Sequence, residues 1–128
     1  MAHWSARFVG RPYTPHQDDC AKLAADVQRE VFGRQVTLPA ERPAGIREAA
    51  QLIAQIERDH GRRIDSPADG CIVLMRRGKE SRPWHVGVYF EQAGEGWVLH
   101  ATQTSGQAIT TRIRQLPMTG LQIEGFYE

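Results

Sequence analysis

The sequence predicts a single α+β domain in which helices pack on one face of an antiparallel sheet. Two helical stretches occupy the first half of the chain, at residues 17–33 and 45–61, and short apolar strands separated by turns follow from residue 64. Helices followed by strands with hairpin-sized connections are typical of this class. A chain of 128 residues with 41% hydrophobic content is also the right size for one core. We therefore assign residues 1–128 to one domain.

The helix expected at residues 17–33 carries Cys20 in its first turn. Its apolar positions recur at the three- and four-residue spacing of one helical face, namely Leu23, Ala24, Val27 and Val31. Polar side chains such as Asp19 precede this run and can cap the first amides, and Gly33 follows where a left-handed residue commonly ends a helix. The amides and dipole of a helix start favour a thiolate, so we expect the pKa of Cys20 to fall. Plain packing of a small apolar side chain is the alternative interpretation of this cysteine.

The other expected elements carry less chemistry. The segment RPYTPH (11–16) contains two prolines and should be extended, delivering Tyr13 to the helix start as a wall of a binding site or as a packing aromatic. The helix at 45–61 has one apolar face with charges opposite. Strands are expected at 71–75, 85–90 and 97–101, with one or two more within 108–116 and 121–127. The sheet should therefore have four to six strands.

Charge and composition exclude several classes of function. Sixteen basic and fifteen acidic residues give a formal charge of +1, which provides no strong field for nucleic acid or an anionic membrane surface. No stretch approaches the roughly 18 apolar residues of a membrane span, and the first residues lack the apolar core of a signal peptide. We therefore expect a chain made in the cytoplasm without a signal peptide, with no membrane span.

The two cysteines, Cys20 and Cys71, form no CxxC pair and match no familiar zinc spacing. A disulfide between them stays open at this point, and it would abolish a nucleophile at Cys20. Cys71 lies within an apolar run, where a cysteine is usually packed, so we expect it to be structural. The basic side chains of Arg76, Arg77, Lys79 and Arg82 fall in the expected connection at 76–83. They either attract carboxylates or form a solvated turn.

Two histidines complete a candidate for cysteine hydrolysis, which needs a thiolate, an imidazole and a group that orients the imidazole. His85 opens an expected strand and shares a face with Gly87, a residue that often marks the close approach of another group. The end of the helix that bears Cys20 is one candidate for that group. His100 lies near the end of the next strand, and adjacent antiparallel strands can place two side chains next to each other. We therefore expect His85 and His100 to form a base and its orienting partner.

Two other interpretations of these histidines stay open. Each could be a half-exposed strand residue with no task, because only geometry shows a catalytic role. Zinc ligation by Cys20, His85 and His100 is the other, although the sequence offers no local pair of ligands. The remaining histidines, His3, His16 and His60, fall in expected loops or at helix ends.

The motifs resemble those of the NlpC/P60 cysteine peptidases, and more narrowly their short phage-tail and prophage members. The matching segments are PYTPHQDDCAKLAADVQREVFG, PADGCIVLM, HVGVYF, WVLHA and LQIEGFYE. The resemblance implies a papain-like fold and hydrolysis of amide bonds in peptidoglycan stem peptides, typically between D-γ-glutamate and a diamino acid. It makes Cys20 the nucleophile, His85 the general base and acid, and His100 the residue that orients His85. It also places Tyr13 and Asp19 along the substrate pocket and implies no cofactor or metal.

The sequence departs from the family pattern at two places. DCAK stands where DCSG is common, so Ala21 and Lys22 replace a serine and a glycine, and DGC stands where GD-x-V is usual.

The function that we expect from the resemblance is that of a cell-wall hydrolase in a phage tail. Such a protein would be part of the virion, act in the bacterial wall and have other tail proteins as partners. The alternatives are a catalytically silent tail-tip component of the same fold, and a cytosolic acyltransferase or amidase that uses the same cysteine and histidine.

Overall fold

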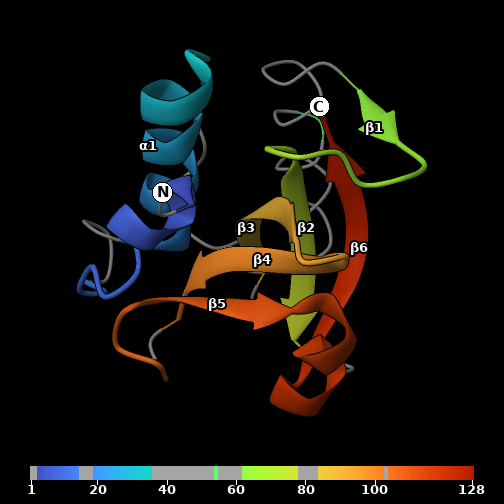
Figure 1. Ribbon diagram of the computed structural model, residues 1–128. Coiled ribbons are helices and arrows are strands. Elements are labelled where there is room, and N and C mark those ends of the chain that lie inside the picture. The colour runs from blue at the N-terminus through green and yellow to red at the C-terminus, as the bar shows by residue number, and fades with distance from the viewer. Residues whose placement is uncertain (1–2, 15–18, 36–53, 55–61, 78–83, 103) are drawn as a thin grey trace.

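A computed structural model describes all of the chain except residues 1–2, 15–18, 36–53, 55–61, 78–83 and 103 (Figure 1). The helix expected at 45–61 therefore lies outside the described residues, apart from Ala54. The described elements are η1 (Trp4–Arg7), α1 (Cys20–Phe32), β1 (Arg63–Ile64), β2 (Ile72–Arg77), β3 (Trp84–Gln92), β4 (Glu95–Ala101), β5 (Ala108–Arg112), η2 (Ile113–Thr119) and β6 (Leu121–Tyr127). The α+β class is confirmed. None of the described helices is long and apolar enough to cross a membrane.

Six strands form one antiparallel sheet in the order β1-β6-β2-β3-β4-β5. Strands β2 to β5 are neighbours in the order in which the chain makes them, while β6 returns to pair between β1 and β2. The sheet twists strongly, so that β4 and β5 cross the direction of β2 and β6 in Figure 1. The tight connection between β3 and β4 has positive φ at both Ala93 and Gly94, as a type I′ turn requires.

Each face of the sheet carries its own core. Helix α1 covers one face, and we call the cluster between them the helix-side core. It contains Cys20, Ala21, Leu23, Ala24 and Val27 of α1 with Ile72, Leu74, Val86, Val88, Phe90, Leu99, Ala101, Ala108 and Tyr127 of the sheet, and Phe8. The cluster on the opposite face, the far-side core, contains Cys71, Val73, Met75, Tyr89, Val98, Leu116 and Leu121. Because both faces are covered, residues 72–75 of β2 are all buried.

Helix α1 is capped at both ends by residues that the sequence indicates. The side chain of Asp19, the N-cap, accepts a hydrogen bond from the backbone N–H of Lys22 at 3.0 Å. Gly33 ends the helix in the left-handed conformation with φ of 67°. Both capping predictions are confirmed.

The structure contains two 3-10 helices, η1 and η2, that the sequence does not predict. Residues 4–7, for which the sequence indicates no helix or strand, form η1, in which Trp4 packs edge-on against Phe90 and Phe32. Residues 113–116, expected as part of a strand, belong to η2. The pairing of β5 with β4 therefore stops at Arg112, and Pro117 lies within η2.

Gly70 fixes the C-terminal half of α1 to the sheet. Its carbonyl accepts a hydrogen bond from Gln28 Nε2 at 2.7 Å, and its N–H donates to the carbonyl of Tyr89 at 2.8 Å. The backbone has φ of 86°, and a Cβ atom at this position would lie 2.5 Å from the ring of Phe32. Glycine is therefore required here both for the backbone angle and for the contact.

Replacing Gly70 with alanine should lower the free energy of unfolding by about 2–4 kcal/mol, the sum of backbone strain and overpacking. Gly10→Ala is the matched control, since Gly10 has φ of 90° but nothing within 4 Å of its Cβ position. The control should lose only about 1 kcal/mol from the backbone. Urea unfolding of both variants measures this, and equal losses would show that contact with Phe32 is not what Gly70 protects.

Candidate active site

Cys20 is the first residue of α1 and is only 6% exposed. The capping of α1 by Asp19 places this cysteine in the turn whose amides have no intrahelical acceptor. No disulfide joins it to Cys71, which settles that alternative. The structure therefore keeps a thiol where the helix dipole favours a thiolate.

The structure brings His85 and His100 together from neighbouring strands. His85 Nε2 and His100 Nδ1 are 2.8 Å apart, which is hydrogen-bonding distance. The other nitrogen of His100, Nε2, lies 2.9 Å from Oγ1 of Thr111 on β5. Both imidazoles are nearly inaccessible, at 4% and 2% exposure. This burial excludes the interpretation of either histidine as a half-exposed residue.

Gly87 allows β4 to lie close enough for this pair to form. A Cβ atom on Gly87 would be 2.5 Å from Cγ1 of Val98, 2.8 Å from the carbonyl oxygen of Leu99 and 3.2 Å from Cβ of His100. The expectation of a close approach is confirmed, but the approaching group is β4 and not the start of α1. A glycine on this face therefore serves the pairing of β3 with β4.

Strand alternation places the two imidazoles on the face of the far-side core. In β3, Val86 and Val88 belong to the helix-side core, while His85 pairs with Met75 of the far-side core. In β4, His100 alternates with Leu99 and shares its face with Val98. The imidazoles thus project from the face of the sheet that α1 does not cover.

The start of α1 nevertheless lies at the same end of the sheet as the histidines. The C-terminal half of α1 lies near the second half of β3. Gly70 connects Gln28 to Tyr89 by hydrogen bonds, and Trp4 packs against both Phe32 and Phe90. Because α1 packs along β3 and β4, Cys20 lies toward the opposite end, where His85 begins β3. Figure 1 shows the arrowhead of β4 just below the N-terminal end of α1. Cys20 and the histidine pair therefore share one rim of the sheet.

The two residues expected along a substrate pocket have structural contacts of their own. The backbone N–H of Tyr13 donates to the carbonyl of Gly106 at 2.9 Å, in the loop between β4 and β5, and its ring packs against the helix-side core. Asp19 is buried and caps α1. Tyr13 thus lies next to the loop that follows His100, and Asp19 lies directly beside Cys20.

The residues that depart from the family pattern also have clear positions. Ala21 is buried in the helix-side core, whereas Lys22 is exposed and its Nζ lies 3.1 Å from both carboxylate oxygens of Asp26. Asp26 is buried and also contacts Arg11 at 2.6 Å and Arg29 at 3.0 Å. Burial alone would raise the pKa of Asp26, but the hydrogen bonds and charges of Arg11 and Lys22 outweigh it and hold that pKa below its ordinary value. These ion pairs tie the first half of α1 to the N-terminal segment.

Cys71 and the described residues of the expected basic connection have structural contacts of their own. Cys71 is buried in the far-side core, and burial raises the pKa of its thiol to about 11. This supports a packing role, as predicted. Arg76 and Arg77 belong to β2 and not to a connection, and Arg76 Nε lies 2.8 Å from Glu124 on β6. Lys79 and Arg82 lie outside the described residues.

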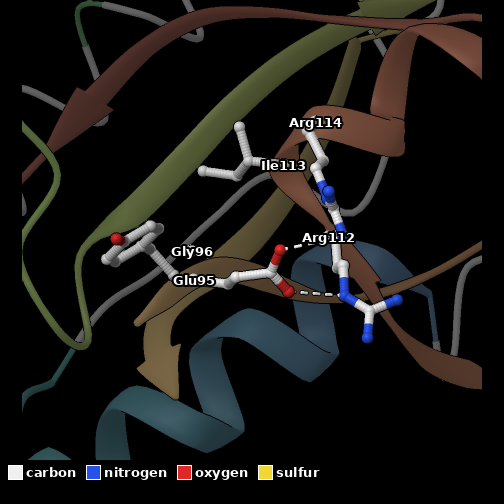
Figure 2. Close-up of a pocket in the computed structure, with 6 residues that line it drawn as sticks. Glu95, Gly96, Arg112, Ile113 and Arg114 are labelled. Carbon is white, nitrogen blue, oxygen red and sulfur yellow. Dashed lines mark hydrogen bonds and ion pairs between the residues drawn. The ribbon is translucent and has the colours of Figure 1, made fainter. Parts of the chain in front are cut away.

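Two pockets lined by described residues adjoin the sheet. The larger, of about 290 Å³, is lined by Glu95, Gly96 and their neighbours at the far end of β4, and Figure 2 shows the Glu95 carboxylate between Arg112 and Arg114. Gly96 is four residues from His100, or about 13 Å along the strand. The other, of about 170 Å³, adjoins His100 itself. Its lining consists of His100, Thr102, Thr104, Ser105, Ile109, Thr111, Thr119 and Leu121.

Comparison of the chain with family models, with curated proteins and with solved structures finds no match. The interpretation of the rim therefore depends on the residues and their geometry. Within the described ranges, no three His, Cys, Asp or Glu side chains are grouped so that they could hold a metal ion. Cys20, His85 and His100 are not grouped in this way.

Thr111 is the residue of this cluster that sequence reasoning missed. Alternation within AITTR puts Thr111 on one face and Thr110 on the other, but this pattern alone names no partner. The partner follows from the pairing of His100 with Ile109, which brings Thr111 diagonally to His100. Between the two strands, the hydroxyls of Thr102 and Ser105 form a local hydrogen-bond network.

Replacing Asp26 with asparagine should lower the free energy of unfolding at pH 7 by about 1–3 kcal/mol, because the three cations lose their shared carboxylate. The pKa of Asp26 is lower in the folded protein than in the unfolded chain, where it is about 3.9. The carboxylate therefore stabilises the fold above about pH 3.9, and this stabilisation is lost as the pH falls through the folded-state pKa. The difference from wild type should therefore shrink on acidification below about pH 4.

Glu124→Gln, which removes the more exposed ion pair with Arg76, is the control and should cost at most about 1 kcal/mol. Denaturant unfolding at several pH values measures both variants. A loss in Asp26→Asn no larger than in this control, or one that grows with acidification, would contradict the role given to Asp26.

Proposed function

We propose that this chain is a cysteine peptidase of the papain-like NlpC/P60 kind that cleaves amide bonds in peptidoglycan stem peptides. The observation that carries the proposal is the hydrogen bond between His85 Nε2 and His100 Nδ1 at 2.8 Å. In this bond His100, as the orienting partner, holds Nε2 of His85. Nδ1 of His85 is then the nitrogen that exchanges a proton with Cys20. The sharing of one rim by Cys20 and the histidine pair supports the same assignment.

In the proposed reaction Cys20 first transfers its proton to His85, and the thiolate attacks the carbonyl carbon of the amide. The oxyanion of the tetrahedral intermediate accepts a hydrogen bond from the backbone N–H of Cys20. His85 then protonates the leaving amine, and a thioester with Cys20 remains. Water gives a proton to His85 and attacks the thioester, which releases the acid and restores the thiol. His100 keeps the ring of His85 in place through both halves.

The substrate and setting follow from the family resemblance. The bond proposed is that between D-γ-glutamate and a diamino acid, with Tyr13 and Asp19 contacting the stem peptide. The setting proposed is a phage tail, in which the enzyme opens the bacterial wall locally and contacts other tail proteins. The position of Tyr13 beside the loop after His100 supports its place at the pocket.

Burial favours a second candidate, a structural tail component with this fold and no turnover. Cys20, His85 and His100 are all at most 6% exposed, and the imidazoles leave the sheet on the face opposite α1. A protein that only retains the arrangement for packing would show the same features. The two candidates differ in whether stem peptides are cut.

Replacing Cys20 or His85 with alanine should each reduce stem-peptide cleavage at least about a thousandfold, because nucleophile and base act as a unit. Cys71→Ala is the matched control and should keep its activity, since Cys71 is a packed thiol whose pKa is raised to about 11 by burial. Mass analysis of defined stem peptides measures cleavage, and circular dichroism shows whether each variant folds. Cleavage that survives in folded Cys20→Ala would exclude the peptidase, and no cleavage by wild type would favour the structural component.

A further inference from the structure

We propose that Thr111 is a positioning residue of this site, whose hydroxyl accepts the Nε2 proton of His100 and so selects the tautomer of the histidine pair. The inference rests on the proposed function and extends the chain of contacts by one strand. His85 on β3, His100 on β4 and Thr111 on β5 form a continuous line, with separations of 2.8 Å and 2.9 Å. Three adjacent strands thus contribute one group each.

The register of β4 and β5 makes this contact specific to Thr111. His100 pairs with Ile109 and Val98 pairs with Thr111, so Thr111 is a diagonal neighbour of His100 on the same face. Thr110 pairs with Leu99 of the helix-side core and lies on the opposite face. The chain therefore places two adjacent threonines in different environments.

The direction of the two hydrogen bonds follows from the proton count of a neutral imidazole, which has one N–H and one acceptor nitrogen. When His85 becomes an imidazolium, both of its nitrogens donate, so His100 Nδ1 must accept. A neutral His100 then has its proton on Nε2, and Thr111 Oγ1 must accept it. With the opposite tautomer of His100, two N–H groups would face each other and the imidazolium form of His85 would be disfavoured.

A neutral hydroxyl suits this position better than a charged acceptor. A carboxylate near Nε2 would favour a doubly protonated His100, and the acceptor for His85 would be lost. The pocket beside His100 is lined by Thr102, Thr104 and Ser105 among others, and apart from His100 its described lining contains no acidic or basic residue. Thr111 therefore contacts His100 where no described carboxylate lines the pocket.

The test compares Thr111→Val, Thr111→Ser and Thr110→Val in the full chain. Valine keeps the shape of threonine but removes the hydroxyl, serine keeps the hydroxyl, and the Thr110 variant controls for a change of β5 alone. The first readout is nitrogen NMR of the histidine rings, which reports the tautomer without any substrate. Wild type, Thr111→Ser and Thr110→Val should show His100 protonated at Nε2, and Thr111→Val should lose this preference.

The second readout is the pH dependence of kcat and KM for stem-peptide cleavage. Thr111→Val should lower kcat about 10- to 100-fold and shift the pH profile, with KM little changed, because a misplaced tautomer impairs the base and not substrate binding. Thr111→Ser should restore most of the activity. A structural role alone would move neither the tautomer nor the pH profile.

Several results would overturn the inference. His100 protonated at Nδ1 in wild type is one, and a Thr111→Val protein with unchanged tautomer is another. Equal effects of Thr110→Val and Thr111→Val would also contradict it. If Thr111 controls the tautomer but wild type cuts no peptide, the positioning contact stands and only the proposed function fails.

Discussion

The close pairing of β3 with β4 at Gly87 is the constraint on which the candidate site depends. A side chain at this position would collide with Val98 and with the backbone of Leu99, so the two strands could not keep their present separation. That separation lets His85 and His100 form a buried hydrogen bond across the strands. A buried polar pair must be satisfied to be tolerated, and Thr111 meets the second nitrogen of His100.

Helix α1 is held against this sheet at two points, which together position Cys20. Gly70 receives the C-terminal half through Gln28 and Phe32, and Asp26 ties the N-terminal half to Arg11. The first turn is thereby directed to the rim where β3 begins and β4 ends. The position of the proposed nucleophile thus depends on contacts some distance from it, as is usual for groups that must be oriented.

The sequence predicted the α+β class, the ends of α1 and the pairing of the two histidines, because capping residues and strand alternation act locally. It did not predict η2, because the strand pattern continues to residue 116, whereas pairing with β4 ends at Arg112. It assigned the close approach at Gly87 to the wrong partner, and it left Thr111 unnoticed. Both depend on strand register, which loops and pairing between distant residues determine.

In the proposed mechanism Cys20 and His85 form an activated pair, and this pairing should be visible in the reactivity of the Cys20 thiol. The rate of alkylation of Cys20 by iodoacetamide, followed against pH in a Cys71→Ala background, reports the thiolate without any substrate. We expect a thiol that titrates well below the ordinary value of about 8.5 and returns toward it in His85→Ala. A thiol that titrates near about 8.5 in both proteins would contradict the claim.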